Sequence, residues 1–140
     1  MRQRRLAGIA LLVAMVIATV GAVQAWAGDS RSAATVNARM VEWKISLSAK
    51  TVPAGKVTFV VKNAGFKLHE FIVIRTNLAP NALPLKGSRA SEAGSLGEIQ
   101  EFRPGLTKQL TLTLKPGKYV LICNIIRHYQ RGQRVGLTVK

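Results

Sequence analysis

The chain has little cysteine, histidine or acid among its 140 residues. Its single cysteine, Cys123, has no partner for a disulfide within the chain, and the only histidines are His69 and His128. The chain has six acidic residues and 21 basic ones. After the first 27 residues there is no sustained helical period, internal repeat or low-complexity stretch, which excludes a helical bundle and a repeat array.

The N-terminal residues have the pattern of an export signal. Residues 1–5 contain three arginines, the run from Leu6 to Val23 is apolar and uncharged, and Ala25-Trp26-Ala27 matches a cleavage site with small residues at its first and third positions. We predict an export signal at 1–27, a linker at 28–36 and one domain at 37–140, in a periplasmic or secreted protein. The apolar run is just long enough to span a bilayer, so an uncleaved segment would tether the protein to a membrane.

The charge of the chain is strongly positive. Its formal net charge is +15, and the predicted export signal accounts for only three of the basic residues. A basic surface of this kind steers a protein toward an acidic partner or an anionic membrane face, or it simply keeps the protein soluble. We do not expect nucleic acid as a partner, because the chain is exported and lacks a stripe of basic and aromatic residues.

The rest of the sequence alternates with the period of two that is typical of β-strands. Val41, Trp43, Ile45 and Leu47 alternate with polar residues and predict one strand over 41–47. Residues 76–97 are rich in proline, glycine and small polar residues, which predicts a long surface excursion with room for a short helix. Together the strands predict an antiparallel sandwich. The other strands are expected at 57–62, 68–75, 98–102, 106–114, 119–122 and 135–139.

The cysteine and the histidines have a spacing that can close around one metal ion. Cys123 and His128 belong to a Cys-x4-His-x4-Gln pattern that ends at Gln133, and His69 stands 54 residues upstream of the cysteine. A thiolate and two imidazoles with a weak axial ligand suit copper that cycles between two oxidation states. An inert buried thiol is the simplest alternative. Zinc is the competing metal, although Gln133 would be a poor fourth ligand for it.

In this arrangement the chain resembles the cupredoxins, the small blue copper proteins. The resemblance covers residues 37–140 and rests on Val52–Val57, on Asn63-x-Gly65 leading to His69-Glu70-Phe71, and on Pro116–Tyr119 leading to Cys123. It implies an all-β, Greek-key antiparallel β-sandwich of about seven to eight strands. It also implies one type 1 copper ion held by His69, Cys123, His128 and Gln133.

Gln133 stands where most cupredoxins place methionine, and in this it resembles the stellacyanin group. An amide oxygen is a harder donor than a thioether and favours the oxidised ion, so a glutamine ligand would lower the reduction potential. The alternative is a three-coordinate site that Gln133 does not reach. Glu70 follows the first histidine, where the family often has a small polar residue that ties the ligand loops together. A glutamate would do this differently or not at all.

The resemblance implies a monomeric protein that shuttles single electrons rather than an enzyme, since enzymes of related fold need further histidines. We expect the edge of His128 to lie near the surface, with a docking rim around it for an acidic or anionic redox protein such as a cytochrome, oxidase or reductase. A copper carrier or reservoir without redox turnover is the alternative function, and a metal-free interaction domain is a third. The residues expected in the rim are Ile125, Ile126, Arg127, Arg131 and Arg134.

Overall fold

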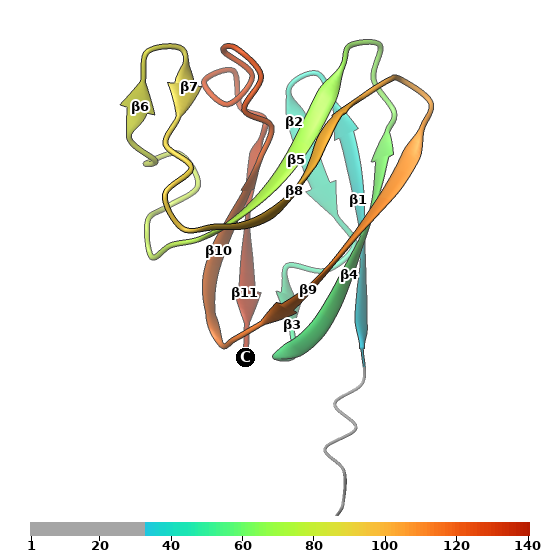
Figure 1. Cartoon of the computed structure of the whole chain (residues 1–140), viewed down its shortest axis with the longest axis vertical. Helices are drawn as coiled ribbons and strands as arrows, with labels where there is room; N and C mark the ends of the chain where they lie inside the picture. Colours follow the sequence, from blue (N-terminus) through green and yellow to red (C-terminus); the bar gives the residue numbers. More distant parts are fainter. Residues whose placement is uncertain (1–32) are drawn as a thin grey trace, which may run out of the picture.

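Two β-sheets face each other and enclose the core (Figure 1). The computed structural model describes residues 33–140, so the predicted export signal and most of the predicted linker lie outside the described residues. The first sheet has the order β2-β1-β4-β9, and the second has the order β3-β11-β10-β5-β8. The first sheet comprises β1 (Ala34–Val41), β2 (Lys44–Leu47), β4 (Gly55–Asn63) and β9 (Thr107–Leu114). The second comprises β3 (Thr51–Val52), β5 (His69–Arg75), β8 (Ser95–Phe102), β10 (Gly117–Ile122) and β11 (Arg134–Val139).

This arrangement confirms the all-β sandwich. Most neighbouring strands are antiparallel, but β1 pairs parallel with β4, and β11 pairs parallel with the short β3. The two main sheets are therefore mixed, and together with a separate two-stranded sheet the described residues form eleven strands, three of them only two residues long. No helix occurs within residues 33–140, and accordingly none there could cross a membrane. β1 begins at Ala34, inside the segment assigned to the linker.

The main core lies between the two sheets, where the alternating residues of each strand point inward. Val36, Ala38 and Met40 of β1 are buried, as are Val57, Phe59 and Val61 of β4, as the period of two in a strand requires. The strand at 57–62 was predicted from the sequence, whereas β1 was not. Burial of each large apolar side chain contributes about 1.5–3 kcal/mol. The core supports a rigid framework whose loops carry the site.

The predicted strand over 41–47 was wrong, because the chain turns at Glu42 and Trp43. β1 and β2 pair as a hairpin with Val41 opposite Lys44, so only these two residues lie between the strands. The polar and apolar alternation continues through the turn, which is why the sequence pattern did not reveal it. The turn carries Glu42 and Trp43 to the end of the sandwich where the ligand loops lie.

The excursion between β5 and β8 contains no helix but the small hairpin β6 (Leu85–Lys86) and β7 (Arg89–Ala90). It covers the outer face of the second sheet. Ile72 and Ile74 of β5 pack there with Leu83 and Tyr129 in a second apolar cluster. Because both faces of β5 are covered, its central residues 71–74 are continuously apolar.

Candidate metal centre

β5 begins and β10 ends at the same end of the sandwich (Figure 1). Three side chains of metal-binding type, His69, Cys123 and His128, meet there. His69 is the first residue of β5, and Cys123 directly follows β10. These two strands are neighbours, with Ile122 opposite Ile72, so the sheet brings the residues together despite their separation in sequence. His128 comes from the loop between β10 and β11. One ligand atom from each of the three residues lies within 4.8 Å of the other two.

The distances between the donor atoms fit a trigonal metal site. Cys123 Sγ lies 3.8 Å from His69 Nδ1 and 3.2 Å from His128 Nδ1. Metal–nitrogen and metal–sulfur bonds of about 2.0–2.3 Å at angles near 120° place donor atoms roughly 3.7 Å apart. The two Nδ1 atoms face the sulfur, so the donors are already arranged around a common centre.

The site is shielded from water. His69 and Cys123 are completely buried, and His128 is 7% exposed. Burial raises the pKa of the Cys123 thiol to about 12, although the backbone N–H groups of Glu70 and Ile125 oppose the shift. Burial also lowers the pKa of His69, although the nearby Glu42 carboxylate acts to raise it. Burial likewise lowers the pKa of His128, and the positive charge of Arg131 lowers it further. Both imidazoles are therefore neutral near pH 7, as metal ligation requires.

The sulfur is further held by the backbone next to His69. The N–H of Glu70 donates to Cys123 Sγ at 3.4 Å, which links the two ligand-bearing segments. The Glu70 carboxylate points elsewhere, with Oε1 3.9 Å from Arg89 Nη1, and burial raises the pKa of that carboxyl. A glutamate at this position thus still connects the ligand loops through its backbone, and the backbone N–H of Asn124, next to Cys123, lowers the pKa of the Glu70 carboxyl against the effect of burial.

Gln133 lies fully buried beside the triad. Its Nε2 donates to the carbonyl of Val41 at 3.0 Å and lies 3.3 Å from His69 Nε2. Its Oε1 is buried and has no hydrogen-bond partner within the described chain. A buried amide oxygen without a partner is costly, so this atom is suited to accept a ligand bond.

Two side chains that the sequence did not single out, Glu42 and Trp43, complete the surroundings. Glu42 Oε1 lies 3.0 Å from His69 Nε2. The ring of Trp43 meets that of His128 at 4.7 Å between centroids, and the guanidinium of Arg131 lies 4.5 Å from the Trp43 ring. The scarcity of acidic residues in the chain was the one signal that could have drawn attention to Glu42.

The loop that carries His128 is fixed by polar contacts to the excursion. Asn124 is buried and bonds through its side chain to both the N–H and the carbonyl of Ala90. The hydroxyl of Tyr129 accepts from the N–H of Leu83 and donates to the carbonyl of Pro80. Gly132 has φ 116°, and a Cβ there would lie 3.1 Å from the carbonyl oxygen of Trp43, so the tight turn before Gln133 favours glycine.

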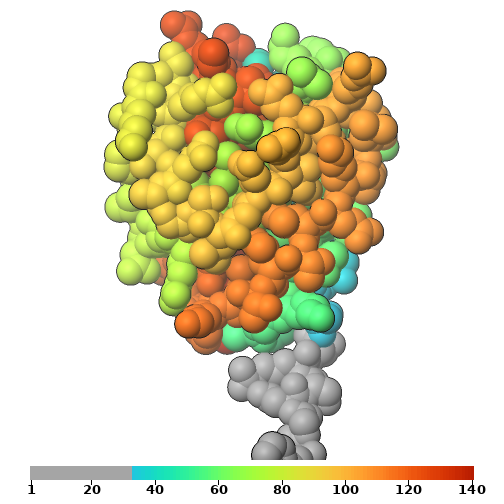
Figure 2. Space-filling model, in the orientation of Figure 1, coloured from blue at the N-terminus to red at the C-terminus, as the bar shows by residue number. Residues whose placement is uncertain are grey.

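The residues predicted to form a docking rim differ in exposure. Ile126 is 59% exposed and Ile125 is half-buried against the core. Arg127 and Arg131 are exposed, whereas Arg134 is half-buried and lies over the Tyr129 ring. The loop after β4 adds apolar surface at the same end of the molecule, where Figure 2 shows it in green beside the red ligand loop. Phe66 of that loop is 81% exposed.

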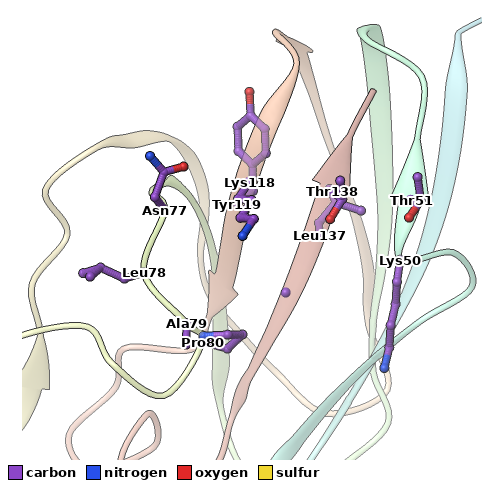
Figure 3. Close-up of a pocket in the computed structure, with 11 residues that line it drawn as sticks. Lys50, Thr51, Asn77, Leu78, Ala79, Pro80, Lys118, Tyr119, Leu137 and Thr138 are labelled. Atoms are coloured by element: carbon purple, nitrogen blue, oxygen red, sulfur yellow. The ribbon is translucent and has the colours of Figure 1, made fainter.

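A cavity of about 430 Å³ lies elsewhere, between the loop at residues 77–80 and strands β3, β10 and β11 (Figure 3). Lys50, Lys118 and Tyr119 are among its lining residues. None of the residues that line it is a histidine, cysteine or carboxylate. It therefore takes no part in the metal centre.

Solved structures of three small proteins resemble this fold. Reduced auracyanin from Roseiflexus castenholzii is 22% identical with a TM-score of 0.58, and the match covers 78% of this chain and 99% of that one. Rusticyanin from Thiobacillus ferrooxidans is 19% identical with a TM-score of 0.55, covering 78% and 79%. An azurin from Methylomonas sp. strain J is 8% identical with a TM-score of 0.54, covering 78% and 99%. At these identities the similarity establishes the fold alone.

Curated proteins give a different similarity. The chain is 32% identical over 118 residues to the iron uptake system component EfeO of Yersinia pestis, which covers 84% of this chain and 26% of that protein. It is 33% identical over 78 residues to the protein of the same name from Yersinia pseudotuberculosis serotype I, covering 56% and 17%. The chain thus spans about a quarter or less of the length of these relatives. No protein-family profile matches the chain.

Proposed function

Because this chain has the cupredoxin fold and its His69-Cys123-His128 triad fits a type 1 copper site, we propose that it is an exported mononuclear copper protein that carries single electrons between redox partners. The observation that carries the proposal is the buried triangle of one sulfur and two Nδ1 atoms. This donor set is the one that suits copper in electron transfer. Both histidines of the chain belong to the triad, which favours a carrier of electrons over an enzyme with further copper centres.

The protein contributes rigidity and exclusion of water. A bound copper ion would supply the one-electron couple between Cu(II) and Cu(I). Cys123 would bind as thiolate, and the Glu70 N–H already points at its sulfur to stabilise that charge. The donors are held by β5, by the end of β10 and by a loop that Asn124 fastens to the excursion. Donors that hardly move between the two oxidation states impose little reorganisation on electron transfer.

We further propose that Gln133 is the axial ligand. Its buried Oε1 has no partner within the described chain, while its Nε2 is fixed by the carbonyl of Val41. The amide is therefore oriented by one of its atoms and leaves the other free for the metal. Blue copper sites accept a glutamine oxygen as a long, weak axial bond.

The same burial argues against the alternative of a copper carrier or reservoir. Such proteins bind the ion through accessible groups that exchange it readily, whereas His69 and Cys123 here are completely buried and only His128 reaches the surface. The one methionine among the described residues, Met40, is buried in the core and not available as a ligand at the surface.

For the docking site we propose the surface around His128. Ile126, and Phe66 from the loop after β4 at the same end of the molecule, supply exposed apolar area, and Arg127 and Arg131 supply positive charge. An apolar centre with a charged border suits a brief encounter with an acidic redox protein, since the charges steer the approach and the small contact allows release.

The visible absorption spectrum of the copper-loaded protein tests the proposal. A type 1 site gives an intense thiolate-to-copper charge-transfer band when oxidised, and this band disappears on reduction. The band should be present in the wild-type protein and absent in Cys123→Ser, which cannot offer a thiolate. A colourless wild-type protein with one Cu(II) bound would contradict the proposed function.

The similarity to EfeO favours a second candidate function, a part in iron uptake. Oxidation of one Fe(II) to Fe(III) releases one electron, which matches a one-electron copper site. Anaerobic addition of Fe(II) to the oxidised protein should then bleach the visible band with one Fe(III) formed for each Cu(I). No bleaching by Fe(II), together with rapid bleaching by a reduced cytochrome, would leave electron transfer between proteins as the function.

A further inference from the structure

Glu42 makes an unusually complete set of contacts for a carboxylate in a turn. Its Oε1 lies 3.0 Å from His69 Nε2 and accepts the N–H of Lys67 at 2.9 Å and that of Phe66 at 3.1 Å. Its side chain is only 9% exposed. The turn between β1 and β2 therefore supplies a third segment to the metal centre, besides the two that carry the ligands.

The carboxylate is enclosed from the opposite side as well. A Cβ at Gly65 would lie 2.5 Å from both carboxylate oxygens of Glu42, so the absence of a side chain there makes room for the carboxylate. The N–H of Ala64 donates to the carbonyl of Met40 at 2.9 Å, which ties the end of β1 to the same loop. Met40 itself is completely buried, so the position of Glu42 is set by the core.

The contact with Glu42 selects one tautomer of His69. If Nε2 carries the proton, it donates to the carboxylate, and Nδ1 presents its lone pair toward Cys123 Sγ at 3.8 Å. In the other tautomer two lone pairs would face each other across 3.0 Å, which is unfavourable. Gln133 Nε2 has a second N–H and lies 3.3 Å from His69 Nε2, but the charged Glu42 carboxylate at 3.0 Å is the closer and stronger partner, so the Nε2–H tautomer is still preferred.

We propose that Glu42 is a positioning residue of the copper site: its carboxylate holds His69 as the Nε2–H tautomer that binds copper through Nδ1, and its negative charge favours Cu(II) over Cu(I). The inference rests on the proposed copper function. A carboxylate behind a ligating histidine fixes the ring and raises the basicity of the ligand. The charge acts in the same sense as the Gln133 oxygen, so both lower the reduction potential.

A purely structural role is the competing explanation, in which Glu42 only anchors the loop through the N–H groups of Phe66 and Lys67. Glu42→Gln separates the two roles, because the amide oxygen can still accept those N–H bonds while the negative charge is lost. Glu98→Gln is the matched control, since it removes the same charge from an exposed position on β8.

The experiment compares Cu(II) affinity, by chelator competition, and reduction potential, by spectroelectrochemical titration, in the wild type and both variants. We expect Glu42→Gln to lose roughly tenfold or more in Cu(II) affinity and to have a higher potential, as loss of a partner behind a ligand usually does. Glu98→Gln should stay within about twofold of the wild type in affinity. Equal potentials in the two variants would overturn the proposal.

The metal-free wild-type protein gives a second readout that needs no variant and no copper. Nitrogen-detected NMR of the imidazole should show His69 with its proton on Nε2. A proton on Nδ1 would overturn the inference even if Glu42→Gln failed to fold. A wild-type protein without the visible band would instead contradict the proposed function, and the NMR spectrum would still decide the role of Glu42.

Discussion

Trp43 meets the ring of His128 edge-on, with 4.7 Å between the ring centroids. It thereby covers the only one of the three donors that reaches the surface. Arg131 stacks on the same indole at 4.5 Å, which adds about 0.5–1 kcal/mol at an exposed site. Trp43 thus forms a lid over the most accessible donor.

Removal of the Trp43 ring should speed the release of copper from the site. We expect Trp43→Leu to release copper to a chelator several-fold faster and to lower the free energy of unfolding by about 1–2 kcal/mol, less than a fully buried tryptophan would cost. Stopped-flow loss of the visible band and urea unfolding measure the two effects. Phe66→Leu is the control, because Phe66 is aromatic but 81% exposed. Equal release rates in the two variants would contradict the shielding role.

Copper binding should release one proton near pH 7. Burial raises the pKa of Cys123 to about 12, so the thiol is protonated before metal binding, whereas both histidines have lowered pKa values and are already neutral. The proton must therefore come from the thiol, and the apparent Cu(II) affinity should rise about tenfold per pH unit above neutrality. The number of protons released for each copper ion bound can be measured with a pH-indicator dye in a weakly buffered solution.

Two other results would contradict this assignment. Release of two protons would mean that a histidine is charged in the metal-free protein, and release of none would mean that Cys123 is already a thiolate. Cys123→Ser should bind the ion more weakly and without the visible band, because a hydroxyl is a far poorer donor to copper than a thiolate.

The triad could be predicted from the sequence because its chemistry is carried by rare residue types. A chain with one cysteine and two histidines offers few other combinations, and the spacing from Cys123 to His128 and Gln133 is local. The sandwich could be predicted as well, since β4, β5 and β10 show strong alternation or continuous apolar runs. In these cases short-range pattern and tertiary structure agree.

Glu42 and Trp43 could not be predicted in the same way. The alternation from Val41 to Leu47 continues through a two-residue turn, and a period of two does not distinguish a hairpin from one longer strand. The contact of Glu42 with His69 joins residues 27 positions apart and depends on how the two sheets pack. The residues next to Glu42 and next to His69 in the sequence give no sign that the two side chains are in contact.

Electron exchange with an acidic partner should depend on salt and on Arg127. Exposed charges are screened beyond the Debye length, which falls from about 30 Å at 0.01 M to about 8 Å at physiological ionic strength. We expect exchange to slow as salt rises and to slow further in Arg127→Glu at low salt. Lys56→Glu is the control, because Lys56 is exposed at the start of β4, at the other end of the molecule (Figure 1). If both variants slow exchange equally, only the net charge matters.

Gln133 gives the sharpest test of the ligand set, through Gln133→Leu and Gln133→Met. Leucine removes the amide oxygen, and a site without that donor should have a higher reduction potential and an altered Cu(II) spin-resonance spectrum. Methionine should raise the potential as well, because a thioether favours Cu(I), while the visible band persists with changed intensity ratios. Both variants also lose the hydrogen bond to Val41, at a cost of about 0.5–1.5 kcal/mol in unfolding free energy.

That loss is common to the two variants, so the difference in potential between them reports the metal and not the lost hydrogen bond. Leucine and methionine are similar in volume and both apolar, which makes them matched for packing in this buried position. If Gln133→Leu has the potential and the spin-resonance spectrum of the wild type, the amide oxygen is not a ligand, and His69, Cys123 and His128 hold the ion as a three-coordinate site.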